Sequence, residues 1–188
     1  MKLLVKTVYW LLVSALIAIA ATASIVARRS RHLETMIADE ATRQGFDPVV
    51  FIALVEKCSS NRTAFADHEH YGLLALTADE GRAWAAENDE AFDTFDLFDP
   101  EKNLRIGAWK FGRMLRSWSR EKDPRIWALA EWRSNHESAR KWAASSKDHL
   151  DDPFAKISDP NVRMFVMEII RRTHRDAFKI ILPWKKES

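Results

Sequence analysis

The pattern of hydrophobic and polar residues divides the chain into an apolar first segment and a longer amphipathic part. Residues 7–27 contain no charged side chain, and about 20 apolar residues are enough for a helix to span a bilayer. Further along, apolar residues recur at intervals of three and four, for example at Leu104, Ala108, Phe111 and Leu115. This spacing predicts amphipathic helices, and we expect little or no strand because no stretch alternates with period two.

Asp-Pro pairs mark most of the predicted helix starts. An aspartate side chain accepts hydrogen bonds from the free N–H groups of a helix start, and proline suits the first helical position because no N–H is needed there. The segment Thr77–Glu80 adds a capping box, and a helix over residues 33–44 should end before Gly45. We therefore predict helices that begin at Asp47-Pro48, Asp99-Pro100, Asp123-Pro124, Asp152-Pro153 and Asp159-Pro160.

These elements predict an all-α domain of six to eight short helices over residues 33–188, behind a membrane helix and a short basic linker in residues 1–32. A chain of 188 residues suits one domain with an appendage, and 47% hydrophobic residues are sufficient for a core. The single cysteine, Cys58, excludes an intramolecular disulfide. A net charge of +2 gives no field that would attract nucleic acid.

The apolar segment is either a retained anchor or a signal peptide that is cleaved after the small residues Ala21–Ala23. We favour the anchor, because the apolar run exceeds the ~7–15 residues typical of a signal peptide. Lysines precede the segment and arginines follow it, and this distribution of positive charge leans against export of the domain. The charges concerned are Lys2, Lys6, Arg28, Arg29 and Arg31.

Four sequence blocks between about Ala41 and Trp142 resemble, in order, the lytic transglycosylase domain of the soluble (SLT) type, within the lysozyme-like superfamily. "EATRQGFDPVVFIALV" resembles the opening helix pair, and "CSSNRTAF" followed by "YGLLAL" resembles "ESsFNpnA" followed by "GLMQL". "DLFDPEKNLRIGAWKFGRML" and "WALAEWRSNHESARKW" resemble the later blocks, and "NVRMFVMEIIRRTHRDAF" resembles the closing helix. The resemblance implies a lysozyme-like helical fold and a peptidoglycan-binding groove.

The same resemblance implies that the family's chemistry is missing. Cys58 stands where the family has its catalytic glutamate, Ala75 where it has a glutamine, and Trp132-Arg133 where it has Tyr-Asn. In the family, that glutamate acts first as the acid and then as the base while the sugar closes an anhydro ring. A thiol with a reference pKa near 8.5 is a poor proton donor for this step, so we predict a catalytically degenerate domain.

Two other carboxylates are weaker candidates for the missing acid. Glu56 lies two residues before Cys58, about 200° around the helix, and should face away from the groove. Glu131 precedes Trp132 and is either a substitute acid or, more simply, a solvated carboxylate. An enzyme that uses either would be an active peptidoglycan lytic transglycosylase.

The resemblance assigns the groove, and the remaining chemistry-bearing residues favour ordinary roles. The segment Asp67–His70 lacks the spacing of ligands on one helix turn, so we expect a solvated loop, no metal site and no cofactor. Trp132 is expected either to pack against a sugar or to fill the space beside the small Cys58. We expect the groove to be lined by Cys58, Ser59, Asn61, Tyr71, Gly72, Trp132 and Arg133.

Three hypotheses for function follow. In the first, a single-pass inner-membrane protein presents a degenerate transglycosylase-like domain outside the cytoplasm, where it binds peptidoglycan or scaffolds envelope proteins. In the second, the chain is an active lytic transglycosylase with a displaced acid. In the third, suggested by the arginines after the apolar segment, the domain faces the cytoplasm and binds another protein.

Overall fold

The computed structural model describes residues 2–145 and 152–181 of the 188-residue chain, and it is built mainly of helices. The chain divides into two compact units, residues 1–36 and residues 37–188. The all-α prediction is confirmed, since the two described strands contain only two residues each, Ala66–Asp67 (β1) and His70–Tyr71 (β2).

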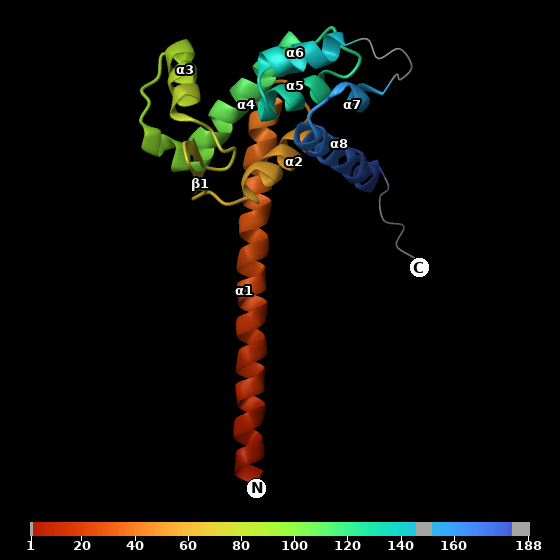
Figure 1. The fold of residues 1–188 in the computed structure, drawn as a ribbon. Coiled ribbons are helices and arrows are strands. Elements are labelled where there is room, and N and C mark those ends of the chain that lie inside the picture. Colours follow the sequence, from red (N-terminus) through yellow and green to blue (C-terminus); the bar gives the residue numbers. More distant parts are fainter. Residues whose placement is uncertain (1, 146–151, 182–188) are drawn as a thin grey trace. The chain divides into compact units, whose positions relative to one another are not determined.

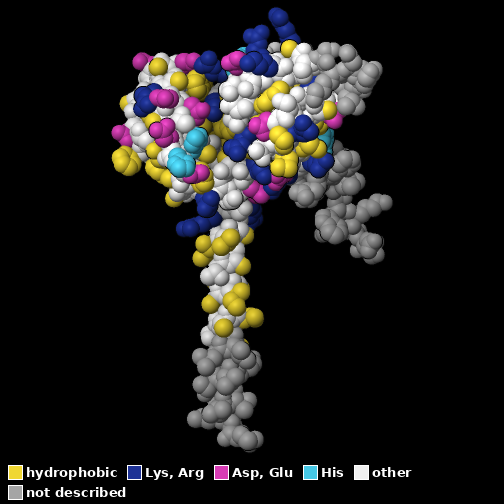
Figure 2. All heavy atoms as spheres, viewed as in Figure 1, with side chains coloured by type: hydrophobic (Ala, Val, Ile, Leu, Met, Phe, Trp, Pro, Cys, Tyr) yellow, Lys and Arg dark blue, Asp and Glu magenta, His cyan; other side chains and the backbone are white. Residues whose placement is uncertain are grey.

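The first helix, α1 (Lys2–Arg43), begins in the first unit and ends in the second. Its stretch Val13–Arg43 is long and apolar enough to cross a membrane, a property that a signal sequence near the N-terminus would share. Figure 2 shows hydrophobic side chains along the described part of this helix. The short basic linker that we expected within residues 28–32 is helical, because nothing in "RRSRH" breaks a helix.

The second unit contains the other helices, and the predicted caps start most of them. Each of the five aspartates of the Asp-Pro pairs accepts a hydrogen bond from a backbone N–H one turn or less into its helix. The capping box at Thr77 and Glu80 is also present. The elements are α2 (Pro48–Ser59), α3 (Ala78–Asn88), the 3-10 helix η1 (Thr94–Phe98), α4 (Pro100–Ser117), α5 (Pro124–Arg133), α6 (His136–Ala144), α7 (Pro153–Lys156) and α8 (Pro160–Ile181).

The core lies where α8 packs against α2 and α5, and where α5 packs against α4 and α6 (Figure 1). Phe46, Phe51 and Phe111 meet there with ring centroids 5.4 to 6.3 Å apart. Leu129 of α5 and Val166 of α8 are fully buried beside these layers. This packing holds α2, α4, α5 and α8 together, and these helices carry the polar residues described below.

A buried asparagine fixes the turn between β2 and α3. Asn103 of α4 is inaccessible to solvent, and its Oδ1 accepts a hydrogen bond of 3.0 Å from the Leu74 N–H. Its Nδ2 donates to the carbonyls of Leu97 and Tyr71 at 2.8 and 3.1 Å. Gly72 has φ +71°, and a Cβ there would lie 2.0 Å from the Leu97 carbonyl oxygen. We call residues 71–76, with Asn103, the locked turn.

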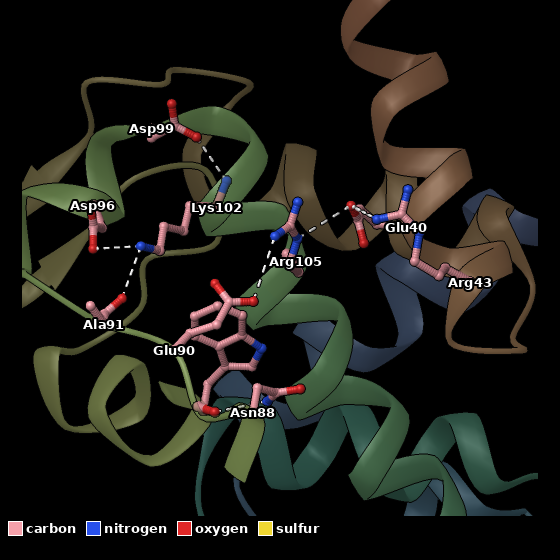
Figure 3. Close-up of polar contacts among 10 residues, drawn as sticks. Glu40, Arg43, Asn88, Glu90, Ala91, Asp96, Asp99, Lys102 and Arg105 are labelled. Atoms are coloured by element: carbon pink, nitrogen blue, oxygen red, sulfur yellow. Dashed lines mark hydrogen bonds and ion pairs between the residues drawn. The ribbon is translucent and has the colours of Figure 1, made fainter. Parts of the chain in front are cut away.

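Ion pairs hold the other side of α4. Lys102 lies 2.9 Å from a carboxylate oxygen of Asp96, and its side chain also donates to the Ala91 carbonyl (Figure 3). Arg105 lies between Glu90, at 3.8 Å, and Glu40 of the last turns of α1, at 4.0 Å. These contacts tie α4 to residues of its own unit on the side that does not line the groove described next.

Candidate functional site

A groove of about 930 Å³ lies in the second unit and contains Cys58 among its lining residues, which makes it the candidate site. Its walls come from α2, the β1–β2 hairpin, α3, α4, α5, the start of α6, and α8. Aromatic side chains at Phe65, Trp132 and Phe165 line it together with charged ones. A groove that combines aromatic faces with polar groups suits a sugar chain better than a purely apolar ligand.

Cys58 of α2 lines this groove and is half-buried. Burial raises the pKa of its thiol from 9.0 to about 11, despite a hydrogen bond with the Trp132 side chain and the nearby charges of Lys110 and Arg133. The charge of Glu80 opposes those two cations. At neutral pH the side chain is therefore an uncharged thiol, neither a useful acid nor a thiolate nucleophile.

An ion pair joins α3 to α4 across the groove floor. Lys110 Nζ lies 2.5 Å from Glu80 Oε1 and 3.9 Å from the centroid of the Trp132 ring. The other oxygen of Glu80 accepts the Thr77 N–H in the capping box. The edge of Trp132 also meets Phe111, at 6.1 Å between centroids. Trp132 is thus held from two sides, and its ring forms part of what we call the Cys58 wall, namely Cys58, Trp132 and Arg133.

Glu131 also lines the groove, and its orientation is fixed. Its Oε2 accepts a hydrogen bond of 2.7 Å from Trp118 Nε1 and lies 3.0 Å from Nδ1 of His136. The carboxylate side chain is only 13% exposed. Its Oε1 has no hydrogen-bond partner among residues 2–145 and 152–181. This carboxylate can accept a hydrogen bond from a ligand hydroxyl.

The structure brings together three of the seven residues expected in the groove: Cys58, Trp132 and Arg133. The other four do not line it. Ser59 is buried with its hydroxyl toward the Val55 carbonyl, and Asn61 lies in the exposed loop that follows α2. Tyr71 and Gly72 belong to the locked turn, which lines the groove through Leu74 and Ala75 instead.

Glu56 lies away from the groove, in the direction that its helical spacing predicts. Its carboxylate pairs with the Arg172 guanidinium of α8. It is therefore a packing group between α2 and α8. A proton donor at this position would point away from a ligand in the groove.

The groove is also lined by charged and histidine side chains that the sequence did not indicate. Glu80 and Lys110 are separated by thirty residues in sequence, and the only available signal was that Glu80 belongs to a capping box at a helix start. His136 lies within a block that resembles the family, but nothing in the block singled it out. The hairpin residues Asp67 and His70 were expected in a solvated loop, but they also line the groove.

The fold is similar to solved structures of lytic transglycosylases. An inactive mutant of the lytic transglycosylase Slt of Pseudomonas aeruginosa matches 80% of this chain, with 18% identity and a TM-score of 0.68. The 70 kDa soluble lytic transglycosylase of Escherichia coli matches 85%, with 15% identity and a TM-score of 0.69. The matches span 24% and 27% of those longer chains, about a quarter of each. No protein-family model and no curated protein sequence matches.

Proposed function

We propose that this chain is a membrane-anchored envelope protein that binds peptidoglycan glycan strands in a lytic-transglycosylase-like groove without cleaving them. The observation that supports it is the combination of an open groove of about 930 Å³ with a half-buried thiol at position 58. The sequence blocks align this position with the acid of the transglycosylases. The fold similarity and the apolar α1 supply the envelope context for the proposal.

The thiol argues against the family mechanism on energetic grounds. A general acid works best with a pKa near the operating pH, and such help is worth about 10²–10⁴-fold in rate. A pKa of about 11 places the Cys58 thiol far from that range. Ala75 and Trp132 stand at two further positions where the family has polar groups, so the loss extends beyond one residue. Binding uses the aromatic faces and polar groups of the groove, which need no acid.

The first experiment is to incubate the full-length chain in detergent with purified peptidoglycan sacculi. We expect the protein to pellet with the sacculi and no anhydro-muropeptides to appear by mass spectrometry, for the unaltered chain. A Cys58→Glu variant run in parallel tests whether the acid alone restores cleavage. Release by the unaltered chain would contradict degeneracy, and a lack of pelleting would move the proposal to a scaffold for envelope proteins.

A second candidate function, an active lytic transglycosylase, is supported by the free oxygen of Glu131. This carboxylate is oriented by Trp118 and His136 and lines the groove, as a displaced acid would have to. Glu131 belongs to α5, whereas the position that aligns with the family's acid, Cys58, belongs to α2. Release of anhydro-muropeptides that is abolished by Glu131→Gln and unaffected by Cys58→Ala would establish this function.

The orientation of the domain is tested separately, because the charges around the apolar segment favour the cytoplasm. We propose that the domain lies outside it, where peptidoglycan is found. A topology reporter fused after Ser188 should be active only outside the cytoplasm. Activity only in the cytoplasm would favour a protein-interaction module instead.

A further inference from the structure

Of the lysines and arginines that line the groove, Arg133 is the one without an ion-pair partner among the described residues. Lys57 pairs with Glu168, and Lys110 pairs with Glu80. Within the described parts of the chain, residues 2–145 and 152–181, no carboxylate lies within 4.0 Å of the Arg133 guanidinium. Of the other acidic residues that line the groove, Glu131 is held through its Oε2 by Trp118 and His136, and Asp67 lies beside His68 on the hairpin.

The Arg133 side chain is exposed and lies over an aromatic ring. Its Cζ lies 5.8 Å from the ring centroid of Phe165, a side chain of α8 that is only 8% exposed. An arginine that rests on an aromatic face keeps the N–H groups along its edge available for a ligand. Those N–H groups form a planar fork that matches a carboxylate with two parallel hydrogen bonds.

The unpaired charge of Arg133 acts on the groove at position 58. The charges of both Arg133 and Lys110 act on the Cys58 thiol, whereas the charge of Glu80 opposes them. Cys58 itself is neutral, so the wall has a net positive charge where an acidic side chain would have repelled an anion. A neutral sugar gains nothing from this charge, while a sugar that carries a carboxylate does.

We propose that Arg133 makes the groove selective for glycans that carry a free carboxylate on the sugar unit next to Cys58. This inference rests on the proposed glycan-binding function and adds the chemical class of the bound unit. The carboxylate has two chemical sources, the lactyl ether group of a muramic acid and the C6 carboxylate of a uronic acid. Both present a planar acceptor of the same size to the guanidinium.

The test measures binding to the full-length chain in detergent by calorimetry, with paired probes. The probes are a muramic-acid-containing tetrasaccharide and a tetragalacturonate, each as the free acid and as the methyl ester, and neutral chitotetraose. We expect at least one free acid to bind about tenfold more tightly than its own ester, because esterification removes a charge-assisted hydrogen bond. The acid that does so identifies the source of the carboxylate.

Variants assign the effect to the arginine. Arg133→Gln should reduce the difference between acid and ester to less than about twofold, and Arg133→Lys should retain part of it, because the charge remains without the fork. Arg140→Gln, at an exposed arginine of α6 outside the groove, should leave the tenfold difference unchanged. Equal binding of acids, esters and chitotetraose would overturn this inference and leave glycan binding standing. No binding of any probe would overturn both.

Discussion

The locked turn and the Cys58 wall border the same groove and are held in different ways. In the locked turn, one buried side chain, Asn103, satisfies three backbone groups, and Gly72 has no room for a Cβ. In the Cys58 wall, the residues are held by aromatic packing and by charges that other side chains could supply. The fold therefore restricts the residue types of the turn, whereas the wall can exchange its chemistry without loss of the fold.

The largest effect should come from Asn103→Ala. The substitution leaves the Leu74 N–H and the carbonyls of Tyr71 and Leu97 without their buried partner, so we expect a loss of about 3–5 kcal/mol in the free energy of unfolding. Denaturant unfolding of the full-length chain in detergent, followed by near-UV circular dichroism, measures it. The control is Asn161→Ala, at an exposed helical position, with an expected change within about 0.5 kcal/mol. Equal stability of both variants would remove the distinction between turn and wall.

A glycine pair tests the same turn through sterics. Gly72→Ala places a methyl group 2.0 Å from the Leu97 carbonyl oxygen and should cost about 2–4 kcal/mol. Gly45 also has a positive φ, of +77°, but a Cβ there meets nothing within 4 Å. Gly45→Ala should therefore cost only about 1 kcal/mol, from the backbone conformation alone. If the two variants have the same midpoint of unfolding, the close approach at Gly72 does not contribute to the free energy of unfolding.

The wall is tested by the reactivity of its thiol. Because burial raises the pKa of Cys58 from 9.0 to about 11, the thiolate fraction at pH 8 is about 100-fold lower than for an ordinary cysteine. Alkylation of the folded chain by iodoacetamide should be slower than that of the denatured chain by about this factor. The rate should rise with pH until the pH passes about 11. A plateau near pH 9 in the folded chain would show that the thiol is not shielded.

The smallest effect is expected at the edge of the wall, with Glu131→Gln. Glutamine can still accept the hydrogen bond from Trp118 but loses the negative charge that faces His136, so we expect a cost of about 1 kcal/mol in unfolding free energy. Pelleting with sacculi should remain within about twofold of the unaltered chain. A loss of pelleting with unchanged stability would place Glu131 among the ligand-binding groups.

The helix starts could be predicted from the sequence because their cause is local. An aspartate before a proline satisfies N–H groups within the next turn, and all five such pairs begin a helix. The meeting of Cys58 with Trp132 and Arg133 was also predicted, through the resemblance of ordered blocks. The replacement of a catalytic glutamate by Cys58 remains a prediction.

The rest of the groove could not be predicted, because it depends on which helix faces meet. Ser59 follows Cys58 directly, and the 100° step between neighbours turns it from the groove into the core. The pair of Glu80 and Lys110 joins two helices whose relative rotation has no local signal. Gly72 was expected to line the groove; in the structure the absence of its Cβ makes room for the Leu97 carbonyl and the Asn103 side chain, which no sequence pattern indicates.

The aspartate that caps α5 makes the start of that helix sensitive to acid. Burial raises the pKa of Asp123, but hydrogen bonds from Arg125 outweigh this, and the pKa lies below its ordinary value of 3.8. The stability that this carboxylate contributes is complete above pH 3.8 and is lost as the pH falls through the lower folded value. Strong acid should therefore weaken the first turn of α5, whose free N–H groups lose the charged acceptor at Asp123. The buried face of the same helix, with Ile126, Trp127 and Leu129, does not titrate, so acid should loosen the start of α5 while its apolar packing stays in place.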